Sequence, residues 1–145
     1  MTPRQWAAFL ARRGRPDSPG FLICRVEDGA IVGGNNINEI VRGVFKSGYL
    51  GYQIGARYAR RGYMTEALAL TLRIAFGRLR LHRVEANIQP GNRASIALVR
   101  RAGFRREGLS PRYLKIGGRW RDHERWALTV ESWRRCRRVR PRRRA

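Results

Sequence analysis

Acidic residues and lysine are scarce in this sequence of 145 residues. Asp and Glu together number 10 and Lys only 2, against 30 Arg, so the formal net charge is +22. An imbalance of this size attracts RNA, DNA or anionic cofactors over a long range and repels strongly cationic small molecules. The composition therefore favours a polyanionic partner or an anionic ligand.

Cysteine is almost absent, and no long apolar run occurs. Cys24 and Cys136 lie far apart in the chain without a metal-ligand spacing, which excludes a disulfide framework and is typical of a reducing compartment. No secretory leader and no apolar stretch of membrane-spanning length is visible. We predict a single cytoplasmic domain that makes no contact with a membrane.

Hydrophobic periodicity predicts short helices and strands in the order of an α/β protein with a mixed sheet. Apolar residues at helical spacing predict helices at 2–10, 62–78 and 92–101, the last closed by Gly103. Alternating residues predict strands at 21–26, 31–32, 38–44, 49–54, 82–88, from 104, at 113–116 and at 125–130. The last twelve residues, from Arg134, hold 8 basic residues and no acid, so we expect a domain at 1–133 and a flexible tail at 134–145.

The stretch from Gly51 to Phe76, GYQIGARYARRGYMTEALALTLRIAF, predicts a strand, a basic loop and a long helix. The free N–H groups and the positive dipole end of a helix start bind phosphate readily. Gly62 lets the loop backbone approach a ligand closely, and Arg60 and Arg61 add positive charge beside it. The pattern favours a cradle for a pyrophosphate-bearing cofactor, although glycine turns before helices also occur in α/β proteins that bind none.

Two further segments extend this pattern, NIQPGNRASIALVRRAGF and REGLSPRYLKIGGRWRDHERWAL. Together with GYQIGARYARRGYMTEAL they resemble the GNAT superfamily of acetyl-CoA-dependent N-acetyltransferases, most closely its ribosomal-protein-alanine (RimJ/RimL type) branch. The resemblance covers about 21–133. It implies the GNAT fold, a mixed and mostly antiparallel sheet flanked by helices, with acetyl-CoA as cofactor.

The resemblance also implies which residues hold the cofactor. The family's pyrophosphate loop falls on Ala59 to Met64, where Gly62 matches the family pattern while Ala59 and Met64 depart from it, so the contacts would rest on backbone N–H groups and arginine charge. Pantetheine would lie against the strand before the loop like an added strand. The implied cofactor-binding residues are Gln53, Ile54, Arg60, Arg61, Gly62, Tyr63, Met64, Asn92 and Ser95, and Arg100 could either reach the 3′-phosphate or be solvated.

The implied reaction is direct attack of an amine on the acetyl thioester. The Ile54 amide is the candidate for binding the oxyanion. The base is either Glu85 or a water held by Asn87, because several relatives carry Glu at the latter position and an amide cannot accept the proton itself. Ser95 is the candidate acid for the thiolate. Structural roles stay open beside these, since Glu85 would also suit a salt bridge on the strand surface and Ser95 a helix cap.

The remaining candidates have structural alternatives as well. His82 and His123 are lone histidines that suit structural positions, and Arg101, like Arg100, could either reach the 3′-phosphate of the cofactor or be solvated. Tyr113 and Trp120 suit packing positions, although either could line a groove for an acceptor peptide.

Relatives normally begin with a further strand and helix that form part of the acceptor groove, and we expect this chain to lack them. Their absence would leave a sheet edge unpaired. Three explanations stay open: a partner subunit, as in a homodimer, covers the edge; the reading frame is shortened; or acceptor binding is impaired.

The sequence thus predicts an N-acetyltransferase whose acceptor is a protein N-terminus, with a ribosomal protein implied by the resemblance. The basic tail would suit contact with rRNA. Two alternatives remain: an acetyltransferase for a small-molecule amine such as an antibiotic or amino acid, and a catalytically poor module of the same fold that binds RNA or ribosomes.

Overall fold

The computed structural model describes residues 15–139, the last of them by its backbone alone. The helix expected at 2–10 therefore lies outside the described residues, as does the end of the expected tail. No helix in the described part is long and apolar enough to cross a membrane.

Six strands form one sheet in the order β1-β2-β3-β4-β6-β5. Only β3 and β4 run parallel, and every other neighbouring pair is antiparallel. The mixed, mostly antiparallel sheet predicted from the sequence is confirmed. The strands are β1 (Gly20–Cys24), β2 (Ile31–Val41), β3 (Ser47–Ile54), β4 (Arg83–Ile88), β5 (Arg105–Ile116) and β6 (Arg119–Thr129).

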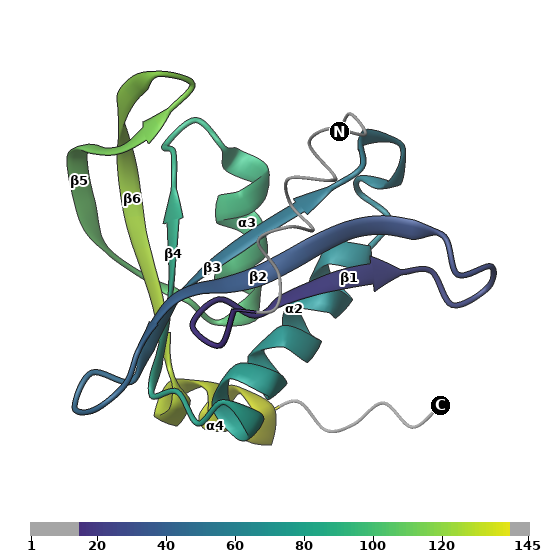
Figure 1. The fold of residues 1–145 in the computed structure, drawn as a ribbon, viewed down its shortest axis with the longest axis horizontal. Coiled ribbons are helices and arrows are strands. Elements are labelled where there is room, and N and C mark those ends of the chain that lie inside the picture. The colour runs from purple at the N-terminus through teal and green to yellow at the C-terminus, as the bar shows by residue number, and fades with distance from the viewer. Residues whose placement is uncertain (1–14, 140–145) are drawn as a thin grey trace.

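Three helices lie against one face of this sheet (Figure 1). They are α2 (Tyr63–Arg73), which continues into the π-helical turn η2 (Ile74–Arg78), α3 (Arg93–Ala102) and α4 (Val130–Val139). The short 3-10 turn η1 (Ala56–Tyr58) connects β3 to the loop before α2. The buried core between helices and sheet is formed chiefly by Leu68, Leu72, Phe76, Val84, Ala86, Leu98, Val99, Trp126 and Leu128.

Local sequence explains where α3 begins and ends. The Asn92 side chain accepts a hydrogen bond from the Ser95 N–H at 3.2 Å, which caps the start of the helix. Gly103 closes the helix at a φ of 99°, in the left-handed region that favours glycine. The stretch between the caps follows the predicted helix to within a residue at each end.

Three sequence expectations differ from the structure. The separate strands expected at 31–32 and 38–44 form one strand, β2, which ends at Val41. The separate strands expected from residue 104 and at 113–116 form one strand, β5, with two irregularities in its pairing with β6. The tail expected to be flexible from Arg134 instead continues as α4 to Val139. The apolar Trp133 ring packs 5.2 Å from the Phe76 ring, and such tertiary contact stabilises a short helix that its own sequence would not.

Candidate active site

A gap opens between β3 and β4, the two parallel strands. Their pairing covers only Ser47–Tyr49 and the three residues from Arg83 to Glu85. Beyond these residues the strands diverge, as Figure 1 shows, and no described strand fills the space between them. Because the two strands run parallel, the helices that follow them, α2 and α3, both begin at the open end of the gap.

The backbone of β3 offers a hydrogen-bonding edge to this gap. Gly33 of β2 lies opposite Ile54, and the Gly55 N–H donates to the Val32 carbonyl at 2.8 Å. Ile54 is therefore at a non-hydrogen-bonded position of the antiparallel ladder, where its own N–H and carbonyl face away from β2. This orientation suits the role predicted for the Ile54 amide.

The same alternation determines which other residues of β3 turn their backbone groups toward the gap. Tyr52, two positions before Ile54, also turns its backbone N–H and carbonyl toward the gap. Gln53 pairs with Gly34 of β2 and uses its backbone groups there. An extended ligand can thus bond to β3 through alternate residues, and Gln53, a predicted cofactor residue, has only its side chain to offer.

The loop before α2 has the backbone shape that the sequence predicts. Gly62 is the N-cap of α2 at a φ of 86°, and Arg60 is also left-handed at 62°. The N–H groups of Tyr63 and Met64, in the first turn of α2, have no backbone partner among the described residues. The ring of Tyr63 stands edge-on to the buried Tyr58 ring, with 6.3 Å between centroids, which fixes the helix start against η1. This end of α2 can hold an anion.

Of the residues predicted on α3, Asn92 and Ser95 lie at its start and Arg100 lies near its end. Ser95 lies in the first turn, half-buried, and faces the gap region beside Tyr52. Asn92 caps the helix, so its carboxamide oxygen is already used by the Ser95 N–H. Arg100 lies exposed in the last turn, about 12 Å along the helix axis from Asn92.

Two buried polar atoms near the gap lack hydrogen-bond partners among the described residues, the Tyr52 hydroxyl and Asn87 Oδ1. Burial raises the pKa of Tyr52, and the nearby Ser95 hydroxyl partly offsets that rise. Unpaired buried polar groups are rare in native proteins, because each costs about 1–3 kcal/mol. Both atoms can therefore bond to a ligand that fills the gap. Together with the free edge of β3 and the start of α2, they fit a ligand with an amide-containing arm and a phosphate-bearing end.

Glu85 is committed to an ion pair. Its side chain is 11% exposed and its Oε1 lies 2.7 Å from Arg83 Nε. The other end of the Arg83 guanidinium binds Glu107, with Nη1 donating to Oε1 at 2.9 Å. The hydrogen bond from Arg83 is the main cause that lowers the pKa of the Glu107 carboxyl group. In turn, the carboxylates of Glu107 and Glu85 raise the pKa of Arg83. The geometry favours the salt-bridge alternative for Glu85 over the base.

An aromatic cluster beside Glu85 joins Tyr113 and His123 to Tyr49, which the sequence alone does not single out. Tyr49 pairs with Glu85 across β3 and β4 and so shares its face of the sheet. The hydrogen bond that the Tyr49 hydroxyl donates to Tyr113, together with burial and the Glu85 charge, raises the pKa of Tyr49 to about 12. The Tyr113 ring lies 6.3 Å from that of His123, whose Nδ1 contacts the Arg121 carbonyl oxygen at 2.9 Å. This cluster covers the sheet face opposite the helices, next to the gap.

The comparisons with known proteins place this geometry in a family. The family model for the acetyltransferase (GNAT) domain matches residues 1–105, more than half of the chain. The chain belongs to the GNAT acetyltransferase family. Members are N-acetyltransferases that use acetyl-CoA, so the fold and the cofactor predicted from the sequence are confirmed. Acetyl-CoA has the amide-containing arm and the phosphate-bearing end that the gap and the start of α2 fit.

Individual GNAT relatives agree with this assignment. The chain is 41% identical over 135 residues to the [ribosomal protein uS5]-alanine N-acetyltransferase of Escherichia coli, covering 90% of this chain and 70% of that protein. It superposes on Mycobacterium smegmatis RimJ in complex with CoA-disulfide with a TM-score of 0.79 at 36% identity, covering 89% of this chain and 61% of that one. The Vibrio fischeri ribosomal-protein-S5-alanine acetyltransferase gives 0.76 at 27%, covering 90% and 69%. The chain thus spans about two thirds of these relatives' length.

Proposed function

We propose that this protein transfers the acetyl group of acetyl-CoA to the N-terminal α-amine of a protein, with a ribosomal protein as the acceptor. The observation that carries the proposal is the diverging pair β3 and β4, whose gap ends at the starts of α2 and α3. The acceptor class rests on the 41% identity to the E. coli enzyme named for the alanine of protein uS5. Because ribosomes and their assembly intermediates are cytoplasmic, a ribosomal acceptor would place the reaction in the cytoplasm.

The chain's residues have separable tasks in this reaction. The phosphates of acetyl-CoA would lie at the start of α2, against the N–H groups of Tyr63 and Met64, with Arg60 and Arg61 beside them. The free edge of β3 would hold the pantetheine arm, and the Ile54 N–H would face the acyl oxygen as negative charge develops there. The amine nitrogen forms a bond to the acyl carbon while the carbon–sulfur bond breaks. Ser95, beside Tyr52, would give the departing thiolate its proton.

The incoming ammonium must also lose a proton. Glu85 is held by Arg83 and cannot take up a proton without losing that ion pair. Asn87, two residues further along the same face of β4, has a buried Oδ1 without a partner. An oxygen in this position can accept a hydrogen bond from a water that relays the proton. We therefore assign the proton path to a water held by Asn87.

Acceptor class is tested with a peptide beginning with alanine and radiolabelled or isotopically marked acetyl-CoA. We expect a single acetyl group on the α-amine, located by fragment-ion mass spectrometry. A polyamine should react at least about tenfold more slowly in kcat/KM, because the charge of +22 repels a cationic acceptor. The same peptide with a blocked N-terminus is the matched control. Equal transfer to the blocked peptide, or faster transfer to the polyamine, would contradict the proposal.

The proton path is tested by comparing Glu85→Gln with Asn87→Ala. The first should keep kcat within about tenfold of the parent protein, whereas the second should lower it by about 10²-fold or more, the usual weight of a proton-transfer device. The measurement is kcat against pH with saturating acetyl-CoA, with melting curves confirming that both variants fold. If instead the Glu85 variant loses the larger factor and the acidic limb of its pH profile, then Glu85 is the base.

A further inference from the structure

A basic groove runs between α2, α3 and α4, from Thr65 in the first turn of α2 to α4. It has a volume of about 690 Å³, and its lining includes side chains from all three helices and from the start of β5. We call it the α4 groove and define it by Arg73, Arg101, Arg105, Arg135, Arg137 and Trp133. Its floor is apolar, formed by Leu68, Leu72 and Leu98.

The cations of the α4 groove are free to bind a partner. None of its five arginines has a carboxylate partner among the described residues, and all are exposed. All 10 Asp and Glu residues of the chain fall within the described part. The one acid on α4, Glu131, contacts His82 at 3.0 Å on the other side of the helix. The groove therefore carries uncompensated positive charge.

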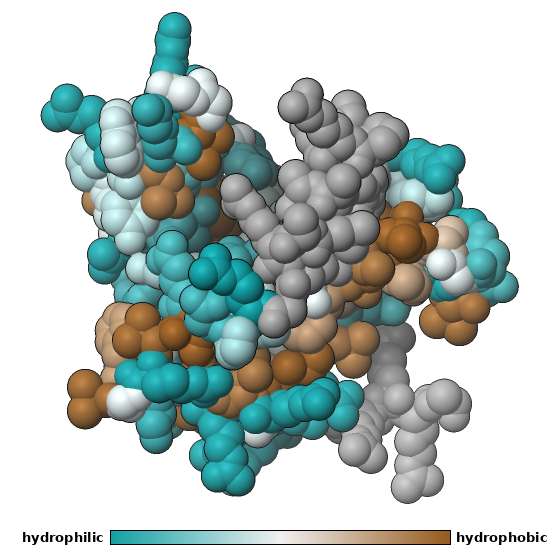
Figure 2. Space-filling view, in the orientation of Figure 1, coloured by the Kyte–Doolittle hydropathy of each residue, from teal (hydrophilic) through white to brown (hydrophobic). Residues whose placement is uncertain are grey.

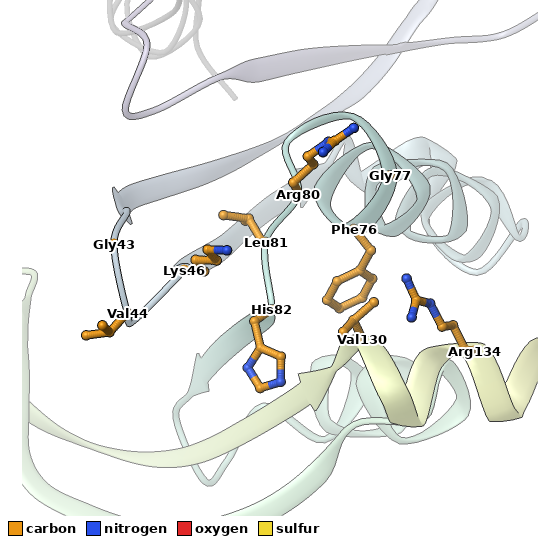
Figure 3. Close-up of a pocket in the computed structure, with 10 residues that line it drawn as sticks. All are labelled: Gly43, Val44, Lys46, Phe76, Gly77, Arg80, Leu81, His82, Val130 and Arg134. Atoms are coloured by element: carbon orange, nitrogen blue, oxygen red, sulfur yellow. The ribbon is translucent and has the colours of Figure 1, made fainter.

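A second basic hollow flanks α4 on that other side. Figure 3 shows its lining, in which Lys46, Arg80 and Arg134 surround Phe76 and Leu81. Figure 2 shows hydrophilic residues at the lower edge of the molecule, next to a band of hydrophobic ones. The helix is thus a ridge with cations on both flanks, and four of the six residues that follow it in the sequence are arginines.

We propose that the α4 groove and the hollow beside it form a docking surface for single-stranded RNA. The phosphates along an RNA strand can each bind one of the arginines that are spread over the three helices. The affinity of such binding falls strongly as the salt concentration rises. The Arg137 guanidinium already lies 4.8 Å from the centroid of the Trp133 ring, an arrangement on which an unpaired base can stack. A membrane surface fits less well, because Val130 and Trp133 of α4 pack against the core and do not face the solvent as insertion would need.

This surface can work together with the active site. The cofactor would bind at the first turns of α2 and α3, whereas α4 and the Arg101 region lie at their last turns. Along α2 the groove extends from Thr65, next to the start of the helix, to Arg73, about 12 Å further along the axis. The inference rests on the proposed function only for the source of the RNA, since a ribosomal acceptor would come with rRNA nearby.

The test is fluorescence anisotropy of a labelled single-stranded RNA with the full chain, over about 50 to 200 mM salt and without acetyl-CoA or acceptor. The variant R73Q/R101Q/R135Q removes one cation from each helix. The matched control R112Q/R119Q/R121Q removes the same charge from the β5–β6 hairpin, at the opposite end of the molecule (Figure 1). All six side chains are exposed, so both variants should fold.

We expect the groove variant to bind RNA at least about tenfold more weakly, with a salt slope smaller by about 2, and the control to bind like the parent. Equal weakening of both variants would overturn the proposal in favour of net charge alone. Tighter binding to duplex DNA, or to vesicles of phosphatidylserine and phosphatidylcholine, would overturn it in favour of those partners. Because no acetyl transfer is measured, this result is independent of the peptide assay.

Discussion

Replacing Gly62 with Trp should abolish micromolar acetyl-CoA binding, weakening it by at least about 100-fold, or about 2.7 kcal/mol. Gly62 begins α2 at a φ of 86° and sits where the loop presents its free N–H groups. A residue with a Cβ costs about 1–2 kcal/mol in this left-handed region, so the loop backbone would shift to relieve it. The indole would also stand in the space in front of the N–H groups, and isothermal titration calorimetry with acetyl-CoA measures the loss.

The same substitution at Gly117 is the matched control, because it distinguishes the effect of backbone strain from the loss of the cofactor-binding loop. Gly117 has a φ of 58° in the β5–β6 turn, and a Cβ built at either glycine meets no atom within 4 Å. Both variants therefore carry similar backbone strain and leave packing intact, but only one is in the loop before α2. Parent-like binding by Gly117→Trp with loss in Gly62→Trp supports the assignment. If both variants bind acetyl-CoA like the parent protein, the assignment of the phosphate site to the start of α2 is wrong.

The cofactor half of the molecule follows from local sequence. A glycine before a helix, Asn92 three residues before Ser95, and alternating strands each depend on neighbouring residues, which is why the loop and α3 lie where the sequence predicts. The non-hydrogen-bonded position of Ile54 adds what the sequence does not contain, the register of β3 against β2. Register decides which N–H groups face the gap and removes the Gln53 backbone from it.

Residues whose roles depend on distant partners were harder to assign. Glu85 has an ion-pair partner two residues away, but the second carboxylate on Arg83 comes from β5, 24 residues later in the chain. Tyr49 and Tyr113 meet although β4 and β6 lie between their strands in the sheet order, so no local pattern pairs them. For α4, the composition of the last residues favoured a tail, whereas the contact of Trp133 with Phe76 determines a helix. Tertiary contacts outweigh local preference in each case.

Replacing Arg83 with Met should lower the free energy of unfolding by about 3 kcal/mol, because it leaves the buried Glu85 carboxylate without its cation. The Arg83 and Glu85 side chains are 20% and 11% exposed, so water cannot take the guanidinium's place. Arg106→Met is the matched control, since Arg106 Nε lies 3.3 Å from Glu124 Oε2 but its side chain is 49% exposed. Such an open pair contributes about 1 kcal/mol or less. Urea unfolding at neutral pH measures both changes.

A second substitution in the same strand distinguishes the loss of a cation from the loss of packing. Replacing both members of a buried ion pair with apolar residues is often neutral, whereas removing one is costly. Adding Glu85→Leu to Arg83→Met should therefore restore most of the lost stability, although Glu107, whose side chain is 38% exposed, then has no guanidinium. Restoration would mean that Glu85 requires Arg83 mainly as a counter-ion, consistent with a structural role for both. If the double variant is as unstable as Arg83→Met, the Arg83 side chain stabilises β4 through its packing, and the ion-pair account of Glu85 is wrong.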